Sequence, residues 1–379
     1  MQYREAGNTG VKLSTLGFGC MRLPKLADDP KTIDVEHSHR LFRRAVELGV
    51  NYFDTAYIYN NGDSERCLGG FLNEVGRDKI IVSTKNPVGH TFWPIPGDTP
   101  TGTLYRRCLE EELERLGTDY IDFYMFHDTT LLAFRTICKP PHGCLDQAIK
   151  AKEEGLIRHI GFSSHDTPDN IKKIIDMGDD NLDLMVCQYN LLDRKNEPVI
   201  EYANAKGIGV SLMGPVGGGR LVHPSDVYSQ AVGASSTPEA ALRFVLANPH
   251  VTTAMSGMNA IEQVEENAAA TSRIEPLAPA ELKAIDALEA KNRELLDLYC
   301  TGCAYCMPCP HGVNIPGNFA AMNTLKVHGL VGLARQMHKR LGDGIAANCQ
   351  ACGECAGKCP QHIDIATRLE EVAAAFAEL

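Results

Sequence analysis

Two tight groups of cysteines are the strongest chemical signal in this 379-residue sequence. Eight of the fourteen cysteines fall in the stretches CTGCAYCMPCP and CQACGECAGKCP, and the others are scattered singly. The grouped cysteines are Cys300, Cys303, Cys306, Cys309, Cys349, Cys352, Cys355 and Cys359. Three cysteines at two-residue spacing, followed by Cys-Pro, are typical of a run that binds a [4Fe–4S] cluster. Zinc also accepts four thiolates, but its sites usually pair two CxxC motifs across a longer gap.

A repeat relates the two groups. CPHGVNIPGNFAAM (309–322) and CPQHIDIATRLEEV (359–372) align at an offset of 50 residues, with Asn314 and Asp364 as expected helix caps. In two-cluster ferredoxins the fourth cysteine of each run binds the cluster of the other run. That pattern predicts one cluster on Cys300, Cys303, Cys306 and Cys359, and a second on Cys349, Cys352, Cys355 and Cys309. A single cluster on the 349–359 run and a partner stays open as the alternative.

Four further reactive side chains lie at or near the ends of apolar stretches. Asp54 follows NYF, Lys85 follows IIVST and His127 follows IDFYMF, while Tyr59 lies five residues after Asp54. A nearby ammonium lowers the pKa of a tyrosine phenol, and a buried carboxylate keeps a lysine charged. A histidine can hold a carbonyl oxygen by a hydrogen bond. The set therefore predicts a general acid for a carbonyl that is being reduced, with Tyr59 as the proton donor.

Elements that could position these side chains follow from the alternation of apolar strands and amphipathic helices up to residue 275. The expected strands cover residues 16–20, 50–56, 80–85, 121–127, 157–164, 184–190, 207–214 and 252–258. Nearly continuous apolar strands separated by helices predict parallel pairing. Eight such units over about 250 residues favour an α/β fold, a closed (β/α)8 TIM barrel, whose chemistry lies at the carboxyl ends of the strands. No G-x-G-x-x-G follows the first strand, which counts against a doubly wound fold.

The motifs DTAxxY (Asp54 to Tyr59), GDSE, STK and FYMFH together resemble the aldo-keto reductase family. The resemblance covers residues 1–290 and implies a catalytic tetrad of Asp54, Tyr59, Lys85 and His127. It also implies NAD(P)H as cofactor and a small aldehyde or ketone as substrate, or the alcohol in the reverse direction. An iron–sulfur redox sensor or interaction module with a nicotinamide-binding barrel of low turnover is the alternative.

The same resemblance assigns positions to the cofactor. GFSS and CQYN match segments around the carboxamide, SLMGPVGGGRL matches the pyrophosphate loop, and SGMNAIEQVEEN matches the adenine segment. The implied residues are Ser163, Ser164, Gln188, Gly217, Gly218, Gly219, Glu266 and Asn267. Relatives that select NADPH usually carry basic residues where this chain has Gly257, Met258 and Gln263. Because arginine or lysine is the natural ligand of a phosphate, NADH and NADPH both stay open.

The expected division is a barrel over residues 1–290 and a small, mainly helical ferredoxin-type iron–sulfur domain over residues 291–379. A net charge of −11 argues against nucleic acid or an anionic membrane as partner. Neither a signal peptide nor an apolar stretch of transmembrane length is present, so we expect a cytoplasmic protein. The expected partners are the small carbonyl substrate and an electron-transfer partner. Hydride transfer needs no cluster, so a structural or sensing role competes with electron delivery.

Overall fold

The computed structural model describes residues 1–90, 93, 95, 99–222, 229, 232–272, 274–292, 300–326 and 331–379. Contacts divide the chain into two compact units. The first unit consists of Met1–Tyr189, Arg194–Pro215 and Leu242–Pro276. The second unit consists of Asn190–Asp193, Val216–Ala241 and Leu277–Leu379. Among the described residues, no helix is long and apolar enough to cross a membrane.

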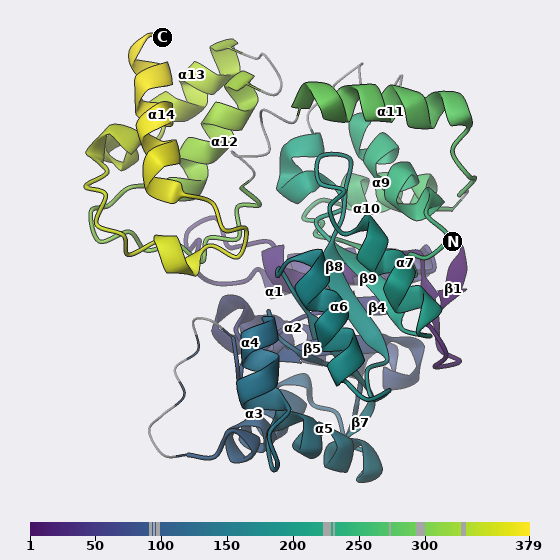
Figure 1. Cartoon of the computed structure of the whole chain (residues 1–379). Coiled ribbons are helices and arrows are strands. Elements are labelled where there is room, and N and C mark those ends of the chain that lie inside the picture. The colour runs from purple at the N-terminus through teal and green to yellow at the C-terminus, as the bar shows by residue number, and fades with distance from the viewer. Residues whose placement is uncertain are drawn as a thin grey trace. The chain divides into compact units, whose positions relative to one another are not determined.

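The first unit contains a closed barrel of eight parallel strands in the order β10-β3-β4-β5-β6-β7-β8-β9 (Figure 1). Their bounds are β3 Leu16–Gly19, β4 Tyr52–Asp54, β5 Ile81–Asn86, β6 Ile121–Phe126, β7 Ile157–Ser163, β8 Leu184–Gln188, β9 Gly209–Met213 and β10 Thr253–Ser256. Seven of them lie within an expected strand, and β5 extends one residue past its expected range of 80–85, so the predicted barrel is confirmed. An antiparallel hairpin of β1 (Tyr3–Glu5) and β2 (Lys12–Ser14) precedes it.

Helices follow the barrel strands along the chain. They are α1 Val35–Glu47, α2 Asp63–Val75, α3 Thr101–Leu116, α4 Leu131–Ala133, α5 Cys144–Glu153, α6 Pro168–Met177, α7 Glu197–Ala205, α9 Thr237–Ala247 and α10 Ile261–Ala270. Helix α1 shows why such segments form. The Asp34 side chain caps it by accepting from the His37 N–H, and Leu41 and Phe42 lie on its buried face. Phe42 packs edge-on against Phe18 of β3 at 4.9 Å, so the apolar face of the helix covers the barrel.

The interior of the barrel is filled with side chains. Tyr52, Phe123, Met125 and Leu184 are fully buried in one cluster with residues of neighbouring strands. Strand β6 is buried along its whole length, which explains its continuous apolar sequence. Because the interior is packed, chemistry in this fold is confined to the ends of the strands.

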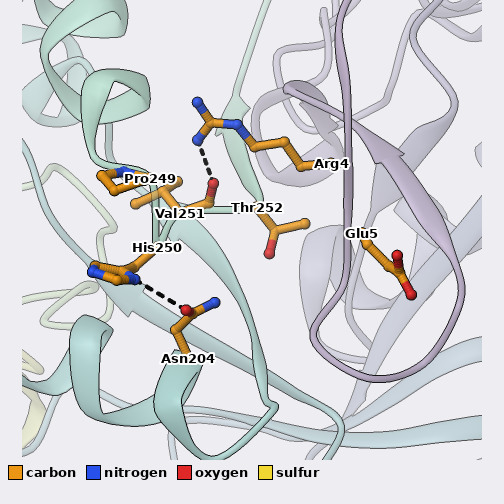
Figure 2. A pocket seen from close by; sticks show the side chains of 7 residues that line it. All are labelled: Arg4, Glu5, Asn204, Pro249, His250, Val251 and Thr252. Carbon is orange, nitrogen blue, oxygen red and sulfur yellow. Dashed lines mark hydrogen bonds between the residues drawn. The ribbon is translucent and has the colours of Figure 1, made fainter. Parts of the chain in front are cut away.

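A pocket of about 340 Å³ lies near the amino ends of β9 and β10 (Figure 2). Its lining is Arg4, Glu5, Asn204, Pro249, His250, Val251 and Thr252. The Arg4 guanidinium donates to the Val251 carbonyl oxygen at 2.5 Å, and a His250 ring nitrogen lies 3.0 Å from the Asn204 side-chain oxygen. These contacts are at the amino ends of β9 and β10, the opposite end of the strands from Asp54, Lys85 and His127.

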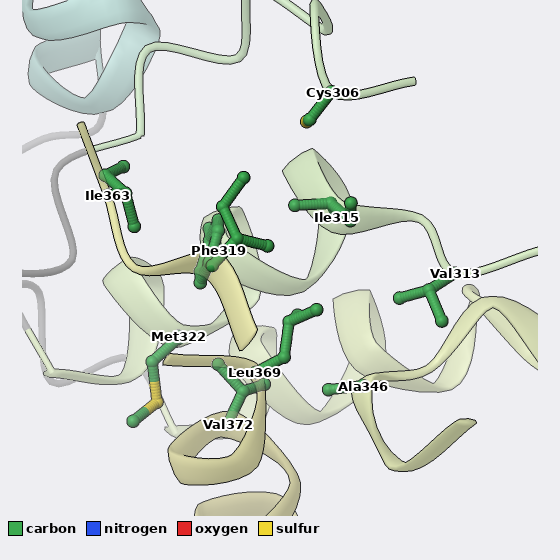
Figure 3. Close-up of a cluster of buried hydrophobic side chains, with 10 residues drawn as sticks. Cys306, Val313, Ile315, Phe319, Met322, Ala346, Ile363, Leu369 and Val372 are labelled. Atoms are coloured by element: carbon green, nitrogen blue, oxygen red, sulfur yellow. The ribbon is translucent and has the colours of Figure 1, made fainter. Parts of the chain in front are cut away.

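In the described residues of its carboxyl-terminal part, the second unit contains the helices α11 Pro279–Asn292, α12 Ile315–Lys326, α13 Val331–Lys339 and α14 Ile365–Ala377. Phe319, Met322, Leu369 and Val372 pack in its buried apolar cluster (Figure 3). The expected mainly helical tail is therefore confirmed among the residues that the structure describes. Asn314 and Asp364 accept from the backbone N–H three residues ahead, at 3.0 and 3.3 Å, which confirms both predicted caps.

Candidate active site and cysteine groups

Four predicted reactive residues come together at the carboxyl ends of β4, β5 and β6. The Lys85 ammonium donates to Asp54 Oδ1 at 2.5 Å and to the Thr55 carbonyl oxygen at 2.7 Å. The Tyr59 ring centroid lies 5.0 Å from Lys85 Nζ and 5.7 Å from the His127 ring centroid. One lysine–carboxylate pair, one phenol and one imidazole thus form a single cluster.

Burial controls the charges in this cluster. Asp54, Lys85 and His127 are between 2% and 4% exposed, whereas Tyr59 is partly exposed. Burial raises the pKa of Asp54, and the Lys85 charge opposes that rise. Burial also holds the pKa of His127 well below its ordinary value, with further lowering by His90, Lys85 and His165. His127 is therefore a neutral imidazole at neutral pH, suited to donate a hydrogen bond.

A tight turn sets the position of Tyr59 between β4 and α2. Asn60 and Asn61 adopt left-handed backbone angles, with φ of 51° and 56°. Asparagine enters this region more readily than most residues, which explains the sequence YNNGD at this turn. The Lys25 ammonium donates to Asn60 Oδ1 at 2.5 Å and holds the turn from outside. Tyr59 is thereby placed beside the strand ends although it belongs to no strand.

Of the two serines expected at the nicotinamide, Ser163 ends strand β7 and Ser164 follows it, and both form hydrogen bonds with the loop after β6. Ser163 Oγ accepts from the Asp128 N–H at 2.9 Å. Ser164 Oγ donates to the Thr129 carbonyl oxygen at 2.7 Å, so its hydroxyl proton already has an acceptor within the chain. Gln188 is buried and ends strand β8, which pairs in parallel with β7. It therefore lies at the same end of the barrel as Ser163.

The residues expected at adenine and pyrophosphate differ in their surroundings. Asn267 of α10 is buried and donates to Ser256 Oγ at 3.2 Å, whereas Glu266 is exposed. Gly217, Gly218 and Gly219 belong to the second unit and have φ of 63°, 67° and 97°. Such angles need glycine, so these residues have a backbone role of their own. A Cβ on Gly219 would meet no atom within 4 Å, which leaves backbone open to a ligand there.

Sequence reasoning missed two residues beside His127. The His90 ring centroid lies 4.8 Å from that of His127, and His90 Nε2 lies 3.9 Å from Asp128 Oδ2. Both residues are close in sequence to predicted site residues, because His90 follows Lys85 by five positions and Asp128 follows His127 directly. That proximity is the signal that could have found them.

The two cysteine loops have the same local backbone course. The N–H two residues after the first cysteine donates to its sulfur at 3.4 Å in each loop, from Gly302 to Cys300 and from Ala351 to Cys349. Left-handed backbone angles also recur two and four residues after that first cysteine, at Gly302, Ala304, Ala351 and Gly353. The repeat seen in the sequence is therefore also a repeat of conformation.

Cysteines from the two groups lie close enough to affect the pKa of one another's thiols. Burial is the main cause that raises the pKa of Cys306 to about 12, and Cys300, Cys303 and Cys359 add to it. Cys355 has the complementary neighbours, because Cys349, Cys352 and Cys309 all raise the pKa of its thiol after burial. Each trio of closely spaced cysteines is therefore accompanied by the last cysteine of the other group.

The donor set fits a cluster in its chemistry. Among the described residues, no three His, Cys, Asp or Glu side chains converge closely enough to hold one metal ion. Soft thiolate ligands without histidine or carboxylate are those that iron–sulfur clusters use.

Comparisons with known proteins agree with this architecture. Residues 15–290 match the model of the aldo/keto reductase family, and residues 299–363 match that of a 4Fe-4S dicluster domain. L-galactose dehydrogenase of Arabidopsis thaliana is 29% identical over 73% of this chain and 90% of that protein. NADH-specific methylglyoxal reductase of Escherichia coli is 28% identical over 70% of this chain and 91% of that protein.

The solved holo structure of aldo-keto reductase AKR11C1 from Bacillus halodurans is similar as well. It covers 76% of this chain and 96% of its own, with 28% identity and a TM-score of 0.62. The barrel match spans well over half of the chain, and the cysteine-rich match follows it directly in sequence. The protein therefore belongs to the aldo/keto reductase family of NAD(P)-dependent oxidoreductases and carries, after its barrel, a 4Fe–4S dicluster domain.

Proposed function

We propose that the protein uses NAD(P)H to reduce an aldehyde or ketone, with Tyr59 as the proton donor. The observation that carries this proposal is the Lys85–Asp54 pair, buried beside Tyr59 and His127 at the carboxyl ends of barrel strands. A buried pair of this kind supplies a fixed positive charge next to a phenol without leaving a charge uncompensated.

Each residue has a defined role in this reaction. A dihydronicotinamide bound at this end of the barrel would supply the hydride for the carbonyl carbon. Tyr59 donates its phenolic proton to the carbonyl oxygen, and the Lys85 ammonium stabilises the phenolate that is left. Asp54 keeps Lys85 charged and in place, and His127 donates a hydrogen bond to the same oxygen. Hydride and proton together convert the carbonyl to the alcohol, and the reverse sequence oxidises an alcohol.

The cofactor contacts are proposed from the resemblance and from the residues' chemistry. Ser163 and Gln188 offer polar side chains at the ends of β7 and β8 for the carboxamide, and Ser164 adds its hydroxyl. Gly217, Gly218 and Gly219 are proposed at the pyrophosphate, where Gly219 offers open backbone. Glu266 and Asn267 are proposed at the adenine. The choice between NADH and NADPH is left to measurement.

The activity test is oxidation of NADH and NADPH by the anaerobically purified protein against a panel of carbonyls. Methylglyoxal belongs in the panel, and L-galactose with oxidised cofactor tests the reverse direction, because relatives are named for these compounds. We expect Tyr59→Phe to lower kcat by about 100-fold or more while cofactor affinity stays unchanged.

Tyr57→Phe is the matched control for this test. The Tyr57 hydroxyl donates to Glu111 Oε2 at 2.5 Å. Tyr57→Phe therefore removes a hydroxyl two residues before Tyr59 that has no role in the proposed proton transfer. Turnover that survives Tyr59→Phe would contradict the mechanism. Cofactor binding without turnover of any carbonyl or alcohol would instead favour the redox-sensor alternative.

We also propose two [4Fe–4S] clusters in a domain of residues 291–379 that follows a barrel domain of residues 1–290. The ligands of the first are Cys300, Cys303, Cys306 and Cys359, and those of the second are Cys349, Cys352, Cys355 and Cys309. The matching loop conformations and the mixed thiol neighbours support this assignment. An electron-transfer partner is proposed only for the case that the clusters are redox-active during turnover.

A further inference from the structure

A buried imidazole and a buried carboxyl lie beside His127 and have no role in the mechanism above. His90, in the loop after β5, is 3% exposed, and Asp128, directly after His127, is 6% exposed. Buried titratable groups cost free energy unless something compensates for them. Two of them next to a reacting group call for an explanation.

The orientation of the His127 ring depends on its packing. Its Nδ1 is buried and has no hydrogen-bond partner among the described residues. Among the described residues, aromatic neighbours of the ring include Tyr59, with centroids at 5.7 Å, and His90, with centroids at 4.8 Å and planes inclined by 64°. The backbone of His90 is held by hydrogen bonds from its N–H to the Pro87 carbonyl oxygen and from the Trp93 N–H to its own carbonyl oxygen. The backbone of His90 is thus held in place, and its ring packs against the His127 ring.

The backbone on both sides of His127 is anchored too. The His127 N–H donates to the Asn86 carbonyl oxygen at 3.2 Å. Asp128 has a left-handed φ of 46°, and its N–H donates to Ser163 Oγ at 2.9 Å. Its carboxyl faces His90 Nε2 at 3.9 Å, which is beyond the distance of a direct hydrogen bond.

Between about pH 4 and about pH 7, neither residue brings a charge to His127. Burial lowers the pKa of His90 to about 4. Burial, followed by the charge of Asp166, raises the pKa of Asp128 to about 7. Between these values His90 is deprotonated and Asp128 is protonated, so both are neutral. Among the described residues, Lys85 and His165 are further titratable groups whose charges act on His127.

We propose that His90 and Asp128 are positioning residues for His127. The His90 ring and the left-handed turn at Asp128 hold the imidazole so that it presents a donor to the carbonyl oxygen of the substrate. This inference rests on the proposed reduction. Neither residue touches the reacting atoms in it, and both act through His127.

The first test compares His90→Ala with His90→Phe, which keeps an aromatic ring but no nitrogen. NMR titration of protein with ¹⁵N-labelled histidine, with His127→Asn to assign the signal, reports the protonation and tautomer of His127 without turnover. We expect His127 to stay neutral in a single tautomer in the natural protein and in His90→Phe. In His90→Ala water enters, so we expect the pKa of His127 to rise toward its ordinary value and the tautomers to mix.

Activity gives the second readout of these variants. We expect His90→Ala to lower kcat by about 10- to 100-fold, with an additional fall below about pH 6.5 where an imidazolium would face Lys85. The KM for the cofactor should stay unchanged, and His90→Phe should recover most of the turnover. His159→Ala, which removes a histidine stacked on Phe123 at 4.9 Å within the barrel, controls for the loss of a packed ring.

Asp128→Asn and Asp128→Ala test the turn separately. Asparagine tolerates the left-handed angle and alanine does not, so we expect His127 to keep its single tautomer only in Asp128→Asn. An unchanged His127 titration in both His90→Ala and Asp128→Ala would overturn the inference. If no carbonyl is reduced by the natural protein, the proposed function fails, and the NMR titration still decides whether these residues position His127.

Discussion

Two buried aspartates near the reacting groups differ in what compensates for their burial. Asp54 has the Lys85 ammonium at 2.5 Å, which opposes the rise of its pKa. Asp128 faces His90 at 3.9 Å, and burial lowers the pKa of that histidine as well. At neutral pH His90 is therefore uncharged and does not compensate for the burial of Asp128. Burial, followed by the charge of Asp166, raises the pKa of Asp128 to about 7.

Asp128→Asn should consequently stabilise the protein at alkaline pH. The folded protein keeps the Asp128 proton up to about pH 7, whereas an unfolded chain releases it at about pH 4. The free energy of unfolding therefore falls as the pH rises through this window, and the full penalty is present above it. We expect the variant to raise Tm by a few degrees at pH 8 and to have little effect at pH 4.5, measured by thermal unfolding. Asp119→Asn, at an exposed site, should leave Tm unchanged at both pH values, and an equal Tm for Asp128→Asn and the natural protein at pH 8 would contradict the prediction.

Between the barrel strands and their helices, a buried polar network joins α2, α3, β5 and β6. The Thr84 hydroxyl lies 2.6 Å from Glu65 Oε1 and 3.1 Å from Glu112 Oε1. Arg115 donates to Glu65 at 3.1 Å, and Tyr124 donates to Glu112. Burial raises the pKa of both carboxyls, and the charge of Glu65 raises that of Glu112 further. One negative charge on Glu65 balances Arg115, so Glu112 keeps its proton.

This assignment predicts opposite effects for two similar substitutions. Glu112→Gln replaces a neutral acid by a neutral amide of the same shape. Because the unfolded chain releases the Glu112 proton above about pH 4.3 while the folded protein keeps it, we expect the substitution to raise Tm at pH 6 and to raise it further at pH 8. Glu65→Gln leaves Arg115 without its buried partner and should destabilise the protein by about 3 kcal/mol at both pH values. Thermal unfolding at the two pH values measures both effects. The charge assignment is wrong if Glu112→Gln is the more damaging change.

At the scale of the whole chain, residues far apart in sequence share one compact unit. Val216–Ala241, which lies between β9 and α9 for most of its length, groups with Leu277–Leu379. A Cβ on Gly218 would lie 2.7 Å from the Thr301 carbonyl oxygen, so the glycine loop packs against the first cysteine loop. Metal binding that joins cysteines from residues 300 to 359 would tie the folding of this unit to its clusters.

Iron analysis of paired cysteine variants tests the crosswise ligands. We expect about eight irons per chain in the natural protein and about four in Cys359→Ser. Adding Cys300→Ser to Cys359→Ser should cost no further iron, because both belong to the same predicted cluster. Adding Cys349→Ser instead should remove the second cluster too. The reverse pattern would show that each run binds its own cluster, and zinc without labile sulfide would exclude clusters.

Much of this protein could be predicted from local sequence patterns. The barrel strands read as continuous apolar stretches because both of their faces are buried, so their number and order were visible without coordinates. Asp54, Lys85 and His127 were found because each lies at or next to a strand end, and Tyr59 because a short turn follows β4. The cysteine spacing and the helix caps are equally local, since each depends on residues a few positions apart.

Only the tertiary structure decided the environment of these groups. The packing of the His90 ring on His127, the protonation of Glu112 beside a charged Glu65, and the contact of Gly218 with Thr301 all depend on the folded structure. Burial and charge depend on which distant segments approach each other, and a local pattern does not specify that approach. The sequence by itself therefore determined which groups could react, while the tertiary structure decided which of them carry a charge and what holds them in place.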